Sequence, residues 1–288
     1  MDNVWYAMIP TLNPATAGAG LPLHEFAALA GKAGFKGIEI NAGEVADLIR
    51  RTSLDNVKSI FASNNVLPTA FGLPVEFRRD EQTWNDTLRA APEIIHAAVA
   101  VGCLRCVTWI MPRSEQSFDD TWRFHVVHLK PAAALLKEQG VAFGVEFVAP
   151  RTMRTGPYDF IWNLDQAIHL AEEIGADGVL LDSFHWFCAG LGTEDIERLR
   201  PEQVVHVHIN DAPNLPRDEQ MDHLRLLPGD GIIDLCGFLS ALEKIGYDGP
   251  VAVEVFGAEL DKLSPEDAAA RAYEALTAVM QQALKSTI

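Results

Sequence analysis

The chain has 288 residues, of which 48% are hydrophobic and 22% are charged, and its formal net charge is −17. This length is close to that of one (β/α)₈ barrel and allows roughly 75% of the unfolded surface to be buried. The negative charge argues against nucleic acid and anionic membranes as partners, and no apolar run approaches the ~20 residues that a membrane span needs.

The elements predicted along the chain alternate between strands and helices. Short β-prone runs bounded by turn residues predict eight strands: Val4–Ile9, Gly37–Asn41, Val66–Phe71, Leu104–Ile110, Val141–Val148, Val179–Asp182, Val204–Asp211 and Val251–Phe256. Amphipathic stretches, several of them ending at a glycine, predict eight helices: Pro22–Ala33, Leu54–Asn64, Gln82–Val101, Asp119–Gln139, Tyr158–Ile174, Thr193–Leu199, Asp234–Ile245 and Pro265–Leu284.

Eight strand–helix alternations predict an α/β fold with a parallel sheet and helical crossovers. Eight units favour closure into a (β/α)₈ TIM barrel over an open, doubly wound sheet. No Pro/Gly-rich linker divides the chain, so we expect residues 1–288 to form a single domain. No GxGxxG follows the first strand, which weakens the dinucleotide-binding alternative.

The N-terminus and the cysteines indicate the cellular compartment. The start, MDNVWYAMIP, lacks a basic segment followed by an apolar core, so we expect no signal peptide and a cytoplasmic protein. Cys103 and Cys106 form a CxxC, but no second pair of ligands completes a zinc ribbon. We therefore expect buried free thiols.

Carboxylates lie within three of the apolar runs. Glu146 and Glu254 fall near the downstream ends of their predicted strands, and Asp182 ends its own. A carboxylate in an apolar strand costs several kcal/mol unless it is paired or binds a metal. In a TIM barrel the carboxyl ends of the strands form the active-site face, so these three side chains should meet.

A histidine joins them from the run VVHVHIND. His206 and His208 lie two residues apart and point to the same side of a strand. Two core histidines are one reading, and a buried ion-pair network is the alternative for the carboxylates. The combination favours one divalent metal ion held by Glu146, Asp182, His208 and Glu254.

This oxygen-rich set suits manganese first, with magnesium, cobalt or zinc as other candidates. Such an ion polarises a carbonyl and acidifies the neighbouring C–H, so that one carboxylate can take the proton and another return it through an enediolate. On the loops beyond the strand ends, His185 and Arg225 are candidates for substrate binding. A loop-packing histidine and a surface charge are their alternatives. Asp211 would orient a ligand or cap its loop.

Five segments in order resemble the sugar phosphate isomerase/epimerase family of xylose isomerase-like barrels: GVEFV, LLDSFHWF, HVHINDAPN, RLLPGDGIIDL and GYDGPVAVEVF. The resemblance is densest from Val141 onward, and GIEI at Gly37 to Ile40 adds to it. It implies a divalent metal on residues matching the four above, with Glu146 and Glu254 doubling as the acid/base pair. It also implies substrate contacts from residues matching His185 and Arg225.

The function predicted is therefore that of a metal-dependent isomerase or epimerase of a keto-sugar or keto-inositol, with an inosose as the first substrate. A dehydratase or lyase that uses the same metal and base is the nearest alternative, and a non-catalytic sugar-binding barrel is another. A homo-oligomer is compatible with the sequence. DNA-repair endonucleases, which are more distant barrel relatives, would need histidines where this chain offers Phe71, Trp109 and Ile110.

Overall fold

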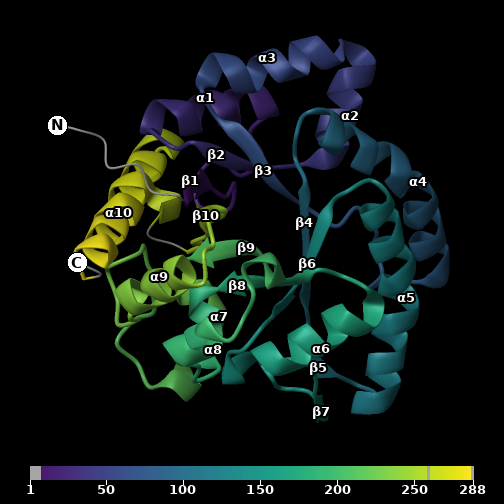
Figure 1. Ribbon diagram of the computed structural model, residues 1–288, viewed down its shortest axis with the longest axis vertical. Coiled ribbons are helices and arrows are strands. Elements are labelled where there is room, and N and C mark those ends of the chain that lie inside the picture. The colour runs from purple at the N-terminus through teal and green to yellow at the C-terminus, as the bar shows by residue number, and fades with distance from the viewer. Residues whose placement is uncertain (1–7, 258–259, 287–288) are drawn as a thin grey trace.

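A closed barrel of parallel strands surrounded by helices forms the body of the protein (Figure 1). The structure, a computed structural model, describes residues 8–257 and 260–286. Neighbouring strands follow the order β1-β10-β9-β8-β6-β4-β3-β2, and β1 pairs with both β2 and β10 to close the ring. The predicted TIM barrel is confirmed.

Eight strands of the described residues build this ring: β1 (Ile9–Leu12), β2 (Gly37–Ile40), β3 (Leu67–Gly72), β4 (Arg105–Ile110), β6 (Ala142–Phe147), β8 (Gly178–Asp182), β9 (Val204–Ile209) and β10 (Pro250–Val253). Two further short strands, β5 (Arg113–Ser114) and β7 (Tyr158–Asp159), pair antiparallel outside the ring.

The helices lie around the outside of the ring (Figure 1). They are α1 (Leu23–Ala33), α2 (Ala42–Arg51), α3 (Leu54–Asn64), α4 (Glu81–Ala100), α5 (Phe118–Glu138), α6 (Leu164–Ile174), α7 (Ser183–Cys188), α8 (Thr193–Glu197), α9 (Leu235–Lys244) and α10 (Pro265–Ser286). The last helix, α10, packs against both α1 and α9, so the end of the chain closes the ring of helices beside its beginning.

Alternation along the strands separates an apolar outer face from a polar interior. In β6, Phe143, Val145 and Phe147 are almost fully buried and share one side, because side chains alternate along a strand. Glu146 therefore points the other way, into the barrel. The same alternation in β9 sends His206 and His208 inward, opposite Val205, Val207 and Ile209.

Some predicted boundaries are wrong. The first strand was expected over Val4–Ile9; residues 4–7 lie outside the described residues, and β1 begins only at Ile9. The fifth helix was expected from Tyr158, but Tyr158 belongs to β7 and α6 begins at Leu164. Asn163 fixes that start, because its side chain accepts a hydrogen bond from the backbone N–H of Gln166.

Two helices were not predicted. The first, α2, follows β2 and is capped at its start by Asn41, whose side chain accepts from the N–H of Glu44. The second, α7, follows β8 directly. It is capped by Asp182, whose Oδ1 accepts from the N–H groups of Phe184 and His185 at 2.7 and 3.1 Å. An acidic strand end thus also serves as a helix cap.

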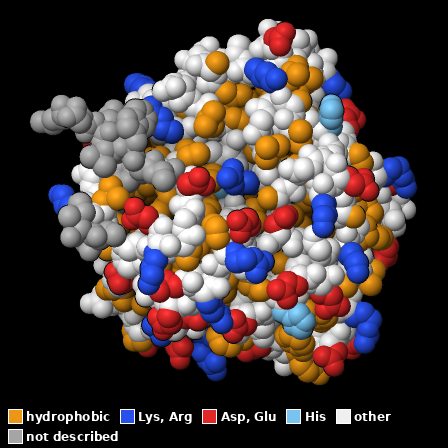
Figure 2. Space-filling view, in the orientation of Figure 1, with side chains coloured by type: hydrophobic (Ala, Val, Ile, Leu, Met, Phe, Trp, Pro, Cys, Tyr) orange, Lys and Arg blue, Asp and Glu red, His pale blue; other side chains and the backbone are white. Residues whose placement is uncertain are grey.

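On the face in Figure 2, acidic and basic side chains are interspersed rather than gathered by sign. Within the described ranges, no helix is both long and apolar enough to cross a bilayer. The four cysteines are free, and Cys103, Cys106 and Cys188 are buried.

Candidate metal centre

Four polar side chains meet at the carboxyl end of the barrel. Glu146, Asp182, His208 and Glu254 each offer one ligand atom, and these atoms lie within 4.8 Å of one another. Glu146, Asp182 and His208 belong to β6, β8 and β9, and Glu254 directly follows β10. These strands are consecutive in the ring, so the structure brings together all four residues that the sequence singled out.

The register of the strands explains this meeting. Asp182 pairs with His208 between β8 and β9, and His208 pairs with Ala252 between β9 and β10. Glu254 lies two residues beyond Ala252 and therefore on the same side of its strand. Nδ1 of His208 lies 3.1 Å from Glu254 Oε2, and 3.9 Å from both Glu146 Oε1 and Asp182 Oδ2.

Asp182 and His208 are buried, Glu146 is 9% exposed and Glu254 is partly buried, and burial acts on the pKa of Glu146, His208 and Glu254 together with the neighbouring charges. Burial raises the pKa of Glu146 well above its ordinary value, and the neighbouring carboxylates of Asp182 and Glu254 raise it further. Burial also acts to raise the pKa of Glu254, but His208 and Arg225 outweigh it and lower that pKa. For His208, burial acts to lower the pKa, whereas Glu254 and Glu39 raise it well above 6.5.

Two buried atoms in this cluster lack a hydrogen-bond partner within the protein. They are Oε1 of Glu146 and Nδ1 of His208, which face each other at 3.9 Å. An unpaired buried polar atom costs about 1–3 kcal/mol, so two of them at one point call for a shared partner. Three carboxylates and one imidazole are hard donors that suit a divalent cation. The residues present therefore fit a metal ion.

Arg225 reaches the same point from the loop after β9. Its Nη1 donates to Asp182 Oδ2 and to Glu254 Oε2, both at 2.8 Å, and its Nη2 donates to His185 Nε2 at 3.1 Å. Asp222 accepts from the same guanidinium. Arg225 and His185 are 5% and 2% exposed, so Arg225 is not the surface charge that was its alternative.

His185 lies in the first turn of α7, where its Nε2 contacts Arg225. Burial lowers its pKa, with Arg225 acting in the same direction against the nearby carboxylates. Because Nε2 accepts from Arg225, the proton of the neutral ring sits on Nδ1, which has no hydrogen-bond partner in the protein. His185 thus offers one unused donor close to the cluster.

The loop that carries Arg225 is fixed by Asp211, which caps it. Asp211 Oδ1 accepts from the N–H groups of Ala212 and Ile233, and Oδ2 accepts from those of Gly229 and Gly231, at 2.8–3.0 Å. A side chain at position 231 would meet the backbone oxygen of Ala212 at 2.2 Å, so only glycine fits there. Asp211 itself is 1% exposed.

A second polar group inside the barrel was not predicted from the sequence. Glu39 of β2 lies 3.0 Å from His206 Nε2 and 2.9 Å from His208 Nε2, both measured to its Oε1. Its Oε2 accepts from Asn13 Nδ2 at 3.0 Å, and the same Nδ2 lies 3.3 Å from Glu254 Oε1. Glu39 shows the same sequence signal as Glu146, a carboxylate in an apolar strand, but it was not among the predicted site residues.

An aromatic side chain lies on the rim of the barrel mouth. Trp109 of β4 pairs in register with Glu146 and so points to the same side. It is 41% exposed, and the guanidinium of Arg78 lies 4.3 Å from its ring centre. Nothing in the sequence indicated Arg78.

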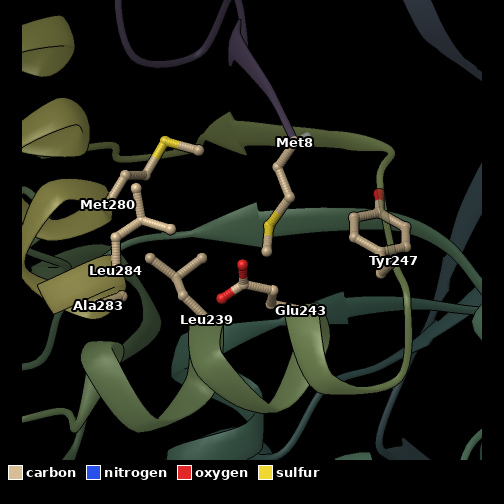
Figure 3. A pocket seen from close by; sticks show the side chains of 7 residues that line it. All are labelled: Met8, Leu239, Glu243, Tyr247, Met280, Ala283 and Leu284. Carbon is tan, nitrogen blue, oxygen red and sulfur yellow. The ribbon is translucent and has the colours of Figure 1, made fainter. Parts of the chain in front are cut away.

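A separate hollow at the opposite end of the barrel has a different character. Figure 3 shows Met8, Leu239 and Met280 around it, with Glu243 and Tyr247 at its edge. Its volume is about 40 Å³. Met8 precedes β1 and Tyr247 precedes β10, so this hollow lies at the amino ends of the strands, away from the metal-type residues.

Comparison with known proteins finds the family of xylose isomerase-like TIM barrels, which matches residues 27–279. An inosose isomerase from Halalkalibacterium halodurans is 28% identical over 242 residues, which cover 82% of this chain and 84% of that protein.

Two solved structures share the fold over nearly the whole chain. A xylose isomerase domain protein from Alicyclobacillus acidocaldarius superposes with a TM-score of 0.88 at 28% identity, covering 96% of this chain and 99% of that one. The IOLI protein, solved with a bound zinc atom, superposes with a TM-score of 0.79 at 26% identity and the same coverage.

Proposed function

This chain belongs to the family of xylose isomerase-like TIM barrels, and from that premise we propose that it is a metal-dependent isomerase or epimerase of a keto-sugar or keto-inositol. The observation that carries the proposal is the pair of buried, unpartnered atoms on Glu146 and His208, which face each other among two further carboxylates. An inosose is the first substrate to try, because the similar protein from H. halodurans is an inosose isomerase.

The proposed metal ligands are Glu146, Asp182, His208 and Glu254. The hard donor set favours manganese, and the zinc atom in the similar IOLI protein makes zinc the competing ion. When bound, the ion would polarise the substrate carbonyl and acidify the C–H next to it. All remaining roles fall to side chains of this chain.

We assign the proton transfer to Glu146 and Glu254. They come from β6 and from the end of β10, with β8 and β9 between them in the ring, so they reach a bound substrate from different sides. One carboxylate takes the proton from the carbon next to the carbonyl, and the other returns a proton across the enediolate. General acid–base catalysis of this kind contributes about 10²–10⁴-fold in rate.

Arg225 and His185 are the proposed substrate-binding residues. The guanidinium of Arg225 already lies against two of the carboxylates, and the free Nδ1–H of His185 is a donor that a substrate oxygen can accept from. The exposed face of Trp109 gives the ring of a sugar or cyclitol an apolar wall. Exclusion of water from this mouth would protect the enediolate.

The test is solvent deuterium incorporation with an inosose and Mn²⁺. Wild-type protein should place deuterium on the carbon next to the carbonyl, and Glu146→Gln and Glu254→Gln should each lower turnover by about 10²-fold or more. Glu172→Gln is the matched control, because Glu172 is exposed on α6 and far from the cluster in the fold. Wild-type rates in both cluster variants would reject the two-glutamate mechanism.

The product decides between the alternatives. A product lacking one water, formed with the same dependence on Glu146, would make the protein a dehydratase. A bound inosose that is recovered unchanged, without deuterium, would make it a sugar-binding barrel.

A further inference from the structure

The Glu39 carboxylate lies inside the barrel and holds two histidines at once. One oxygen, Oε1, is 3.0 Å from Nε2 of His206 and 2.9 Å from Nε2 of His208. The two histidines are buried and Glu39 is largely so: 12% of the Glu39 side chain is exposed, and the figures for His206 and His208 are 0% and 6%. The contact joins β2 to β9 across the interior, because these strands are not neighbours in the ring.

We propose that Glu39 is a positioning residue, which fixes the ring of His208 so that Nδ1 faces the metal centre and which also orders the carboxylate of Glu254 through Asn13. The proposal rests on the metal centre described above. Glu39 itself does not touch the ion or the substrate.

The chemistry of the imidazole decides which nitrogen of His208 can bind an ion. The pKa of the free imidazole of His208 is raised, but metal binding displaces one ring proton, and the neutral ring that remains has one protonated nitrogen and one lone pair. Nε2 of His208 faces the Glu39 carboxylate and donates its proton there, so the lone pair is on Nδ1, which faces Glu254, Glu146 and Asp182. A carboxylate behind a histidine in this manner fixes the tautomer and the ring orientation and makes the other nitrogen a better ligand.

The other oxygen of Glu39 connects it to Glu254 through Asn13. Oε2 accepts from Asn13 Nδ2, which also donates to Oε1 of Glu254. That contact engages one oxygen of Glu254 and leaves Oε2 turned toward His208 Nδ1 and Arg225. Asn13 is 6% exposed and follows β1, so a single buried chain of contacts links β1, β2, β9 and the end of β10.

A second metal ion on Glu39, His206 and His208 is the competing explanation, since these three donors also lie within 4.8 Å of one another. It requires His208 to give a lone pair from each nitrogen, which means loss of both ring protons. It also leaves only three protein donors, because the free oxygen of Glu39 is occupied by Asn13. Hydrogen bonding from both histidines satisfies the same geometry without either cost.

The experiment measures metal binding by titration calorimetry, with Mn²⁺ and with Zn²⁺, on wild-type protein and on Glu39→Gln. Glutamine keeps the size of the side chain, but it removes the charge and turns an N–H₂ group toward the donor of Asn13. We expect one ion per chain in both proteins and a Kd that is about 10–100-fold weaker in Glu39→Gln. Glu44→Gln is the matched control: Glu44 lies in α2, just after β2, and its Oε1 accepts from the N–H of Leu23 rather than from a residue of the centre, so metal affinity should stay unchanged.

A spectroscopic measurement separates positioning from general loss of structure. In ¹⁵N-histidine NMR spectra of the Zn²⁺-loaded protein, we expect His208 to show a metal-bound Nδ1 and a strongly hydrogen-bonded Nε2 proton. In Glu39→Gln that proton resonance should move upfield while the protein remains folded. Unchanged affinity together with an unchanged Nε2 resonance would overturn the proposal.

The stoichiometry distinguishes the other outcomes. If wild-type protein binds two ions and His206→Phe binds one, Glu39 is a ligand of a second metal and the positioning role is wrong. If wild-type protein binds no divalent ion at all, the proposed function fails first, before Glu39 is tested. With one ion bound to wild-type protein, His206→Phe should keep that stoichiometry.

Discussion

The Asp211→Asn substitution would test how firmly the Arg225 loop must be held. Asp211 accepts four backbone N–H groups, two on each oxygen. Asparagine keeps one acceptor oxygen and presents an N–H₂ group in place of the other. Whichever way the amide turns, two backbone N–H groups lose their acceptor and face a donor instead.

The size of the effect follows from those two bonds. A hydrogen bond to a charged group is worth about 1.5–3 kcal/mol. Because the turn from Pro228 to Gly231 can open and let water replace part of the loss, we take the low end, about 3 kcal/mol for the pair. Every 1.4 kcal/mol is a factor of ten, so the loop should open about 100-fold more often.

Hydrogen exchange followed by mass spectrometry measures this directly on residues 225–233, without any substrate. The amides of Gly229 and Gly231 should exchange about 100-fold faster in Asp211→Asn than in wild-type protein, while the strands of the barrel keep their protection. Asp218→Asn is the control, because Asp218 is an exposed residue of the same loop. Equal exchange in the wild type and Asp211→Asn would refute the role of Asp211 as the clamp.

Three further outcomes are expected. Removal of the ion with a chelator should lower the melting temperature by roughly 5 to 10 °C relative to protein with free ion at 100 times its Kd, since such binding stabilises the fold by about 2.7 kcal/mol. His208→Ala should abolish that difference, and an equal shift in this variant would exclude His208 as a ligand. Arg225→Ala should lower the free energy of unfolding by about 3–5 kcal/mol in the presence of chelator, where Asp182 loses the buried guanidinium that neutralises it, and by less in Mn²⁺. Equal losses in the two conditions, measured by chemical denaturation, would contradict this. Burial lowers the pKa of His125 to about 4, so below pH ~6.5 the unfolded chain takes up a proton that the folded chain does not. The free energy of unfolding should therefore fall by about 3 kcal/mol as the pH drops from ~6.5 to ~4. His125→Gln should flatten this slope, and an unchanged slope would show that other groups cause it.

The barrel and four of its interior residues could be predicted because each gives a local signal. An apolar run predicts a strand wherever it lies, and a carboxylate inside such a run is conspicuous without knowledge of its partner. Parallel strands then bring their carboxyl ends together, so Glu146, Asp182, His208 and Glu254 needed no further information to be grouped. The same reasoning gives Glu39 a polar position in a strand, but not the identity of the strand it faces.

Helix starts were harder to predict because they depend on single hydrogen bonds. Tyr158 was placed in a helix on the strength of the apolar residues that follow it, whereas it pairs with Ser114. Helix α7 was not predicted, because its cap is Asp182, a residue already assigned to the metal site. One side chain can serve both purposes, since Oδ1 accepts from the backbone and Oδ2 faces the cluster.

In three of the four proposed ligands, one atom is held by a neighbouring group while another faces the centre. Asp182 gives one oxygen to a helix and turns the other to the centre, Glu254 gives one oxygen to Asn13 and turns the other to the centre, and His208 gives one nitrogen to Glu39 and turns the other to the centre. Each side chain is thus tied at one atom, which costs its rotamer freedom during folding rather than when a ligand binds. A centre built in this way should bind its ion with little rearrangement. It also means that loss of a tying residue such as Glu39 should weaken binding even though every atom that faces the centre is still present.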